Sequence, residues 1–371
     1  MLSYRHAFHA GNHADVLKHL VLLQLLDYLT QKDKALYVID THAGAGAYDL
    51  KSDYAKKLAE FQGGIGRLWE VPPADLPPAL ADYVARIRQF NGNEANGPLR
   101  LYPGSPWLAQ QGLRDIDRLR LYELHSTDAR LLAANFKDAG RQVQVTSGDG
   151  LAGMKALLPP PSRRALVLID PSYEVKTDYA TIYKSLQDAL QRFATGTYAV
   201  WYPCLNRPES RQFPDRLKRL PAKDWLHVSL HVRSPDADGF GMAGSGMFIL
   251  NPPWTLAATL KEVMPRLVEL LAEEEDAGKG AHFVLESGAG GTLGDTPLRP
   301  ERARPTVFNP RGSAGFPSNT AGRKAPRAPA ASAGQKPGRP AGKPGNPPQS
   351  PRNPAATPRP PRKGPSGRSG A

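Results

Sequence analysis

Cysteine is almost absent from this chain of 371 residues, in which Cys204 is the only one. An intrachain disulfide is therefore excluded, and the reducing cytoplasm is the expected compartment. Hydrophobic runs of membrane length are also lacking, because the most apolar stretch, from Leu20 to Leu29, is interrupted by Gln24 and Asp27. The first nineteen residues carry charges and histidines where a signal peptide needs an apolar core. We therefore expect neither a secreted, disulfide-stabilised domain nor a membrane protein.

Acidic and large apolar residues are scarce at the end of the chain. Residues 287–371 contain 18 of the 37 prolines and 15 Lys or Arg, but only two acids, Asp295 and Glu301. Such a segment buries too little surface to offset the entropy of ordering, so we expect a disordered, basic Pro/Gly/Ala-rich tail. Residues 1–286 contain 33 basic and 33 acidic residues, so the net charge of +13 lies on the tail. A cationic tail attracts phosphate without sequence preference, and a purely compositional tail remains the alternative.

Short apolar runs alternate with helical patterns over residues 1–286. A helix is predicted from Asn12, a good N-cap, to about Thr30. Two further helices are predicted at 125–140 and 179–193. Five strands are predicted between the helices, at 35–39, 119–123, 143–145, 166–169 and 198–202. This alternation predicts an α/β fold with a parallel, doubly wound sheet.

The end of the folded part departs from this alternation. Residues 226–232 alternate between apolar and polar, and 246–251 form another apolar run after a short loop. Because the loop is too short for a crossover helix, we predict an antiparallel hairpin. A mostly parallel seven-stranded sheet with such a terminal hairpin resembles the Rossmann-like methyltransferases. Residues 49–118 are interpreted as a helical insertion for substrate recognition within the domain of residues 1–286.

Polar residues follow the first three predicted strands. Asp40 precedes a Gly44-Ala45-Gly46 turn, Glu123 ends the second strand and Asp149 follows the third. Open α/β sheets bind ligands at this edge, where the carboxyl ends of parallel strands meet. Glu123 offers two oxygens to two ribose hydroxyls, and Asp149 is placed for an adenine amino group. A nicotinamide dehydrogenase is disfavoured, because its fingerprint needs glycine or alanine where this chain has Asp49.

The fourth of these strands leads into Asp170-Pro171-Ser172-Tyr173. This segment resembles the Asp-Pro-Pro-Tyr signature of amino-methyltransferases that use S-adenosylmethionine, with Ser172 in place of the second proline. Asp170 and the Pro171 carbonyl would accept the two hydrogens of an amino group on a planar ring, and Tyr173 would stack on that ring. Packing of Tyr173 in the core is the alternative. We predict Asp170, Pro171 and Tyr173 as the catalytic residues.

Histidine is concentrated near the N-terminus, at positions 6, 9, 13 and 19. A metal site is disfavoured, because zinc sites of this size usually include cysteine or a regular pair on one helix face. We therefore expect no metal. His19 lies on the first predicted helix and is interpreted as a hydrogen-bond partner near the cofactor, with a core histidine as the alternative.

A family resemblance covers about residues 1–285. Six segments carry it: Met1 to His19, Asp40 to Gly46, Pro103 to Pro106, Glu123, Gly148 to Gly150, and Asp170 to Glu174. Together they resemble the large-subunit ribosomal RNA (adenine-N6)-methyltransferase J family. The resemblance implies that seven residues contact S-adenosylmethionine or the reacting centre: His19, His42, Ser105, Glu123, Asp149, Gly150 and Asp170. It further implies that Lys18 lies beside the cofactor and that Tyr4 contacts the RNA.

The resemblance also implies an activity, the methylation of N6 of adenine 2030 in 23S ribosomal RNA. The RNA is expected to be protein-free, and the enzyme a monomer in the cytoplasm. Residue spacing alone predicts only amino-methylation of a planar ring. Two alternatives therefore stay open: a DNA adenine-N6 methyltransferase, and a non-catalytic RNA-binding or assembly factor with the same fold.

Overall fold

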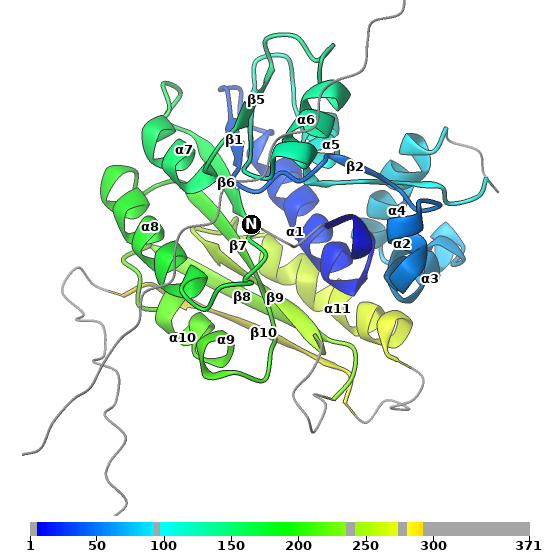
Figure 1. Cartoon of the computed structure of the whole chain (residues 1–371). Coiled ribbons are helices and arrows are strands. Elements are labelled where there is room, and N and C mark those ends of the chain that lie inside the picture. The colour runs from blue at the N-terminus through cyan, green and yellow to red at the C-terminus, as the bar shows by residue number, and fades with distance from the viewer. Residues whose placement is uncertain (1–5, 93–96, 235–241, 274–279, 292–371) are drawn as a thin grey trace, which may run out of the picture. The chain divides into compact units, whose positions relative to one another are not determined.

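The central element of the structure is a sheet of eight strands. The computed structural model describes residues 6–92, 97–234, 242–273 and 280–291. The strands of the sheet are β1 (Tyr37–Asp40), β4 (Arg118–Glu123), β5 (Val143–Ser147), β6 (Ala165–Ile169), β7 (Thr197–Pro203), β8 (Asp224–His231), β9 (Gly244–Leu250) and β10 (His282–Ala289). Their order is β10-β8-β9-β7-β6-β1-β4-β5 (Figure 1). The strands β5, β4, β1, β6 and β7 pair in parallel, which confirms the doubly wound prediction and brings their carboxyl ends to one edge.

The last strands extend the sheet in the opposite direction. Strand β9 lies between β7 and β8 and is antiparallel to both, as the predicted hairpin requires. Strand β10 pairs antiparallel with β8 and was not predicted, so the predicted count of seven strands is one too few. Its sequence is a weak strand signal, because Gly288 and Ala289 contribute little apolar surface. The strand also continues past the predicted domain end at residue 286, whereas residues 292–371 lie outside the described residues.

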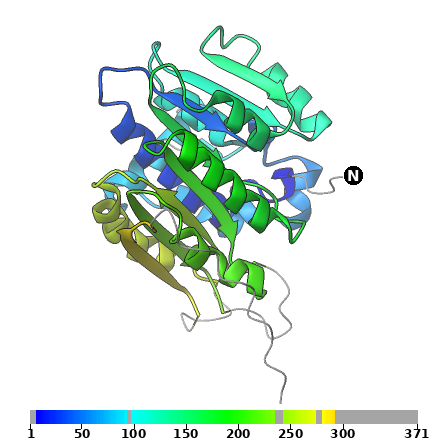
Figure 2. The same ribbon diagram turned by 90° about the vertical axis from the view of Figure 1, so that its left-hand side faces the viewer.

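Helices cover both faces of the sheet. On one face lie α1 (His13–Leu29), α5 (Ser105–Gly112), α6 (Ser126–Asn135) and α11 (Leu256–Leu271). On the other lie α7 (Gly150–Leu157), α8 (Asp178–Arg192) and α10 (Phe213–Leu217), which follows the short α9 (Pro208–Arg211). Figure 2 shows this second group, in green, across the near face of the sheet. No helix in the described ranges is long and apolar enough to cross a membrane.

Helix α1 is buried on nearly all sides, because it lies between the sheet and other helices. The side chain of Asn12 accepts hydrogen bonds from the backbone nitrogens of Ala14 and Asp15, both at 3.0 Å, which confirms the predicted N-cap. Burial on all sides also encloses the polar residues Lys18 and His19. A buried charge is costly without a partner, so we expect oppositely charged side chains next to Lys18.

The segment between β1 and β4 is mostly helical. It contains α2 (Asp53–Leu58), η2 (Glu60–Gly63), α3 (Ile65–Trp69), η3 (Pro73–Asp75), α4 (Pro78–Phe90) and a small sheet of β2 (Ala47–Asp49) and β3 (Leu101–Pro103). A short 3-10 helix, η1 (His6–Phe8), precedes α1. The insertion packs against α1 and α11, and the Arg67 guanidinium donates to the backbone oxygens of Leu270 and Ala272. These contacts fix the insertion beside the carboxyl edge of the sheet.

Candidate active site

A cavity of about 230 Å³ opens at the carboxyl ends of the parallel strands. Nine of the residues predicted from the sequence line it: Lys18, His19, His42, Ser105, Glu123, Asp149, Gly150, Asp170 and Pro171. Five carboxylates but only one Lys or Arg contribute to its lining. A cavity of this charge favours a cationic ligand and disfavours one with a pyrophosphate.

Glu123 closes one side of this first cavity. Its Oε2 accepts the backbone N–H of Gly44 at 2.8 Å, and its Oε1 accepts that of His125 at 2.7 Å. Burial raises the pKa of Glu123, and these two backbone hydrogen bonds oppose the rise. Each carboxylate oxygen retains a second lone pair. Glu123 is thus oriented by the backbone and can still accept a pair of ligand hydroxyls.

Asp149 and Gly150 begin α7 just after β5, the strand next to the one that ends at Glu123. Asp149 Oδ1 accepts the backbone nitrogen of Leu151 at 2.8 Å, which orients the carboxylate as an N-cap. A Cβ at Gly150 would lie 2.0 Å from the Thr41 carbonyl oxygen, so only glycine allows this approach of α7 to the loop after β1. Asp149 and Gly150 thus bring the start of α7 against the loop after β1, and both line the cavity.

Asp40 lies behind the cavity wall and supports it. Ser105 Oγ donates to Asp40 Oδ2 at 2.7 Å, and the His42 backbone nitrogen donates to Asp40 Oδ1 at 3.2 Å. Burial lowers the pKa of His42 to about 4 and that of His19 to about 3, so both imidazoles are neutral at pH 7. Neutral imidazoles near the cavity add no charge that would repel a cationic ligand.

Replacing Asp40 with asparagine should stabilise the protein at alkaline pH. Burial raises the pKa of Asp40 to about 7, so its contribution to stability is fully present below pH 4 and is lost as the pH rises through 7. At roughly 1.4 kcal/mol per unit, the variant should gain up to about 4 kcal/mol over wild type at pH 8 and much less at pH 5. Urea unfolding of both proteins at the two pH values measures this. A gain independent of pH would mean that Asp40 is not protonated in the folded protein.

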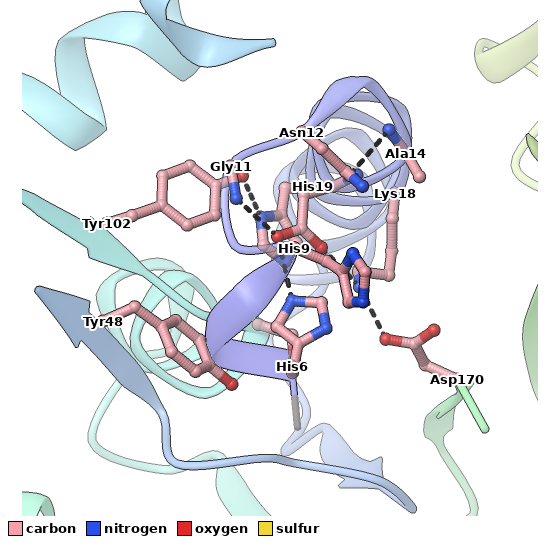
Figure 3. Close-up of polar contacts among 12 residues, drawn as sticks. His6, His9, Gly11, Asn12, Ala14, Lys18, His19, Tyr48, Tyr102 and Asp170 are labelled. Atoms are coloured by element: carbon pink, nitrogen blue, oxygen red, sulfur yellow. Dashed lines mark hydrogen bonds and ion pairs between the residues drawn. The ribbon is translucent and has the colours of Figure 1, made fainter. Parts of the chain in front are cut away.

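A chain of charged groups leads from Asp170 to the N-terminal segment (Figure 3). Lys18 Nζ lies 2.6 Å from Asp170 Oδ2 and 2.7 Å from Asp15 Oδ1, and His6 Nε2 lies 2.9 Å from Asp15 Oδ2. Burial alone would lower the pKa of Lys18, but the two carboxylates raise it above its usual range. Burial also raises the pKa of Asp170, and Lys18 opposes the rise. Lys18 is therefore a permanent cation that holds one oxygen of Asp170.

A second cavity of about 540 Å³ lies on the other side of Asp170. Four residues line both cavities: His6, Lys18, Asp170 and Ser172. Trp201 and Pro203 of β7 line the second cavity, and Lys18 Nζ lies 5.7 Å from the centre of the Trp201 ring. Glu60 and Gly63 of the insertion line it as well. Asp170 therefore lies where two cavities adjoin and lines both of them.

Tyr173 does not line either cavity. Its side chain is 1% exposed, its hydroxyl donates to the Trp201 carbonyl at 2.7 Å, and its ring packs against Tyr179 at 4.5 Å. The predicted stacking role is therefore wrong for this structure, and the alternative of a core aromatic holds. The backbone of Tyr173 has a φ of 52°, which turns the side chain into the core. This conformation is not readable from the four-residue motif.

Two residues that border the site were missed, and one that was predicted lies outside the described residues. His6 lines both cavities but was considered only as a metal ligand. Trp201 was taken as part of a strand, although an aromatic near the carboxyl end of the strand beside Asp170 is a usable signal. Tyr4 falls outside the described residues. Among those residues, no group of three His, Cys, Asp or Glu converges to hold a metal ion.

The sheet order, with β9 antiparallel between β7 and β8, and the site at the carboxyl edge define a Rossmann-like methyltransferase. Residues 33–284 match the family described as "Ribosomal RNA large subunit methyltransferase D, RlmJ". The chain belongs to this family. The resemblance identified from the sequence is thereby confirmed.

Individual relatives agree with the family assignment. The chain is 46% identical over 276 residues to Ribosomal RNA large subunit methyltransferase J of Haemophilus influenzae, covering 74% of this chain and 95% of the relative. It is 45% identical over 267 residues to the Escherichia coli protein of the same name, covering 72% and 93%. A solved structure from Legionella pneumophila has 38% identity and a TM-score of 0.67, and the match covers 76% of this chain and 98% of that one.

Proposed function

We propose that this protein transfers a methyl group from S-adenosylmethionine to N6 of one adenine in 23S ribosomal RNA, adenine 2030 in the usual convention. The position of Asp170 where the two cavities adjoin carries the proposal, because the amino nitrogen must meet the sulfonium methyl group in line at the junction of the donor and acceptor sites. The names of the family and of its relatives support the RNA substrate. We further propose that it acts as a monomer in the cytoplasm on RNA free of ribosomal proteins.

The first cavity suits S-adenosylmethionine, which carries a positive charge on sulfur. Its carboxylate-rich lining fits a cation, and Glu123 is oriented to accept the ribose hydroxyls. Asp149 would accept the adenine amino group, and His42, Ser105 and Gly150 would complete the wall. When bound, the cofactor supplies an electrophilic methyl group attached to a good leaving group.

Asp170 and Pro171 prepare the adenine amino group. The N6 lone pair is delocalised into the ring, so the amino group is a weak nucleophile. Acceptance of its hydrogens by Asp170 and the Pro171 carbonyl would favour a tetrahedral nitrogen with its lone pair directed at the first cavity. Lys18 holds Oδ2 of Asp170 at 2.6 Å, which leaves Oδ1 for this contact. Because burial raises the pKa of Asp170, the carboxylate is also suited to accept the departing proton.

The second cavity is the proposed site of the target base. An adenine in a duplex cannot reach Asp170, so it must leave its stack. Trp201 lines this cavity and offers an aromatic surface that the motif tyrosine does not. Lys18 places a positive charge beside Trp201, and this charge remains paired with Asp15 and Asp170.

Methyl transfer to three substrates tests this function. Full-length protein and radiolabelled S-adenosylmethionine are incubated with deproteinised large-subunit RNA, with assembled large subunits and with duplex DNA. We expect the fastest transfer to the deproteinised RNA, because the target base is then free to leave its stack. Faster transfer to DNA would support the DNA methyltransferase alternative. No transfer to any of the three would support the non-catalytic RNA-binding alternative.

Removing the basic tail should change RNA binding but not chemistry. A protein that ends at Gly291 keeps β10 complete, including the backbone bonds of Gly290 and Gly291 to Lys223 and Leu220. We expect the turnover rate on saturating RNA to be unchanged. RNA affinity at low salt should fall, with a flatter dependence of log affinity on log salt, because fewer phosphates are neutralised. Equal salt slopes for both proteins would show that the tail has no role in RNA binding.

A further inference from the structure

Four basic residues lie near the carboxyl ends of β6 and β7. Lys176 is in the loop after β6 and Lys184 is on α8, whereas Arg207 and Arg211 precede and end α9 after β7. Lys176, Lys184 and Arg211 are exposed, and Arg207 is half-buried. We call these four residues the basic rim. The helices α8 and α9 that carry or adjoin them lie on the same side of the sheet (Figure 1).

The basic rim lacks the ion pairs found elsewhere on the surface. Arg192 lies 2.7 Å from Asp188, and Arg266 lies 2.9 Å from Glu269. In the described ranges, none of the four rim residues forms such a pair with a carboxylate. Residues 204–219 contain five Lys or Arg and two acids, whereas residues 1–286 are balanced overall. Arg207 and Arg211 therefore belong to a local excess of positive charge, whereas Lys176 and Lys184 lie in a segment that also contains Glu174, Asp178 and Asp188.

The rim adjoins both cavities: α8, which carries Lys184, lines the first cavity with Thr181 and Ile182, and Arg207 lies beside the second. Pro203 and Leu205 line the cavity, and Arg207 follows two residues later. Ser210 Oγ donates to the Pro203 carbonyl at 2.6 Å and accepts the Leu205 backbone nitrogen at 3.0 Å. This side chain holds the loop that carries Arg207 against the cavity wall. A fixed backbone at this loop lowers the entropy cost of placing Arg207 beside an anion.

The carboxylates Glu60 and Glu273 also line the second cavity, but both have partners. Glu60 contacts His9 at 3.0 Å and accepts a hydrogen bond from Asn12 at 2.9 Å, and Glu273 lies 3.5 Å from Arg233, which lines the same cavity. Arg207 and Arg211 form no such pair in the described ranges and therefore remain available to an RNA phosphate.

We propose that the basic rim binds backbone phosphates of single-stranded RNA next to the target adenine. This inference rests on the proposed function and adds the path of the substrate strand. A flipped base requires an unstacked strand, and its flanking phosphates remain outside the cavity. The residues 1–286 have no net charge, so local cations must supply the attraction close to the site.

Paired charge removals test the rim in the full-length protein. One variant carries Arg207→Gln and Arg211→Gln, and a second carries Lys176→Gln and Lys184→Gln. Binding to a single-stranded RNA that contains the target adenine is measured against salt concentration. Each lost phosphate contact should reduce the slope of log affinity against log salt by about 0.7, so each double variant should lose about 1.4. The KM for RNA should rise, and kcat at saturating RNA should stay within about twofold.

A matched control removes the same charge elsewhere. Lys137 after α6 and Lys261 on α11 are exposed and belong to the other face of the sheet, so Lys137→Gln with Lys261→Gln should change neither slope nor KM. If the wild-type protein methylates RNA but the rim and control variants have equal salt slopes, the rim proposal is wrong and the proposed function still stands. Failure of the wild type to methylate any RNA would instead contradict the proposed function. Unchanged melting temperatures confirm that all variants are folded.

Discussion

Replacing Asp170 with asparagine is expected to lower the rate of methyl transfer by about 10³-fold at saturating RNA and cofactor. The amide keeps the shape of the side chain and one acceptor oxygen, but it lacks the negative charge that strengthens the hydrogen bond to N6 and allows the side chain to take up the departing proton. Lys18 retains Asp15 as a partner at 2.7 Å, so the buried ammonium is not left alone. Affinity for S-adenosylmethionine should stay within tenfold of wild type, because Glu123 and Asp149 make the proposed contacts to the nucleoside part.

Single-turnover kinetics and calorimetric titration of the cofactor measure the two effects separately. Asp188→Asn is the control, because Asp188 is a surface carboxylate paired with Arg192 on α8. It should change neither rate nor affinity. A wild-type rate in Asp170→Asn would place the acceptor of the amino hydrogens elsewhere. A large loss of cofactor affinity with little loss of rate would make Asp170 a cofactor ligand first.

Replacing Glu123 with alanine is expected to act on the cofactor instead. Hydrogen bonds to a charged group are each worth roughly 1.5–3 kcal/mol. Loss of two ribose contacts should therefore weaken S-adenosylmethionine binding by about 100-fold or more, at about 1.4 kcal/mol per tenfold. The backbone nitrogens of Gly44 and His125 also lose their acceptor, which loosens the turn after β1. The rate at saturating cofactor should fall much less than in Asp170→Asn.

Glu123→Gln separates the loss of the ribose contacts from the loosening of the turn after β1. Glutamine keeps one acceptor oxygen, so the Gly44 or the His125 contact survives and binding should weaken by an intermediate factor. Titration of S-adenosylhomocysteine into each variant avoids turnover and reports affinity directly. A dissociation constant of Glu123→Ala within threefold of wild type would place the ribose elsewhere in the first cavity.

The carboxyl edge of the sheet was readable from the sequence. Apolar runs end at Asp40, Glu123 and Asp170. Carboxylates at the ends of buried parallel strands indicate a ligand site at that edge of the sheet. The alternation of apolar and polar residues at 226–232 and the short loop before 246–251 also predicted the antiparallel hairpin. Strand β10 was missed, because its side chains are half-buried or exposed and its pairing with β8 depends on the edge that the rest of the fold creates.

The orientation of individual side chains was not readable. Of the two residues predicted from the same motif, Asp170 lines both cavities and Tyr173 lines neither, because the left-handed backbone at Tyr173 is a property of the folded loop. The aromatic surface of the second cavity comes from Trp201, on a different strand. The ion pairs of Lys18 with Asp15 and Asp170 likewise depend on how α1 crosses the sheet.

A second tetrapeptide shows why the motif alone is insufficient. The segment Asn251-Pro252-Pro253-Trp254 has two consecutive prolines, whereas the motif that begins at Asp170 has only Pro171. It follows β9, which is antiparallel to β7, so it lies at the opposite edge of the sheet. The Asn251 side chain donates to the backbone oxygens of Ala194 and Gly196 and accepts the Lys223 backbone nitrogen. These hydrogen bonds make the segment a capped turn. The direction of the preceding strand decides at which edge of the sheet such a motif lies.

The identity of the methylated nucleoside is the most direct test of the account. Deproteinised 23S RNA is reacted with the full-length protein, digested and analysed by mass spectrometry, with Asp170→Asn as the parallel reaction. We expect N6-methyladenosine at a single position, formed by wild type and nearly absent with the variant. Methyl groups on another base or another atom of adenine, or equal product from Asp170→Asn, would contradict the proposed function.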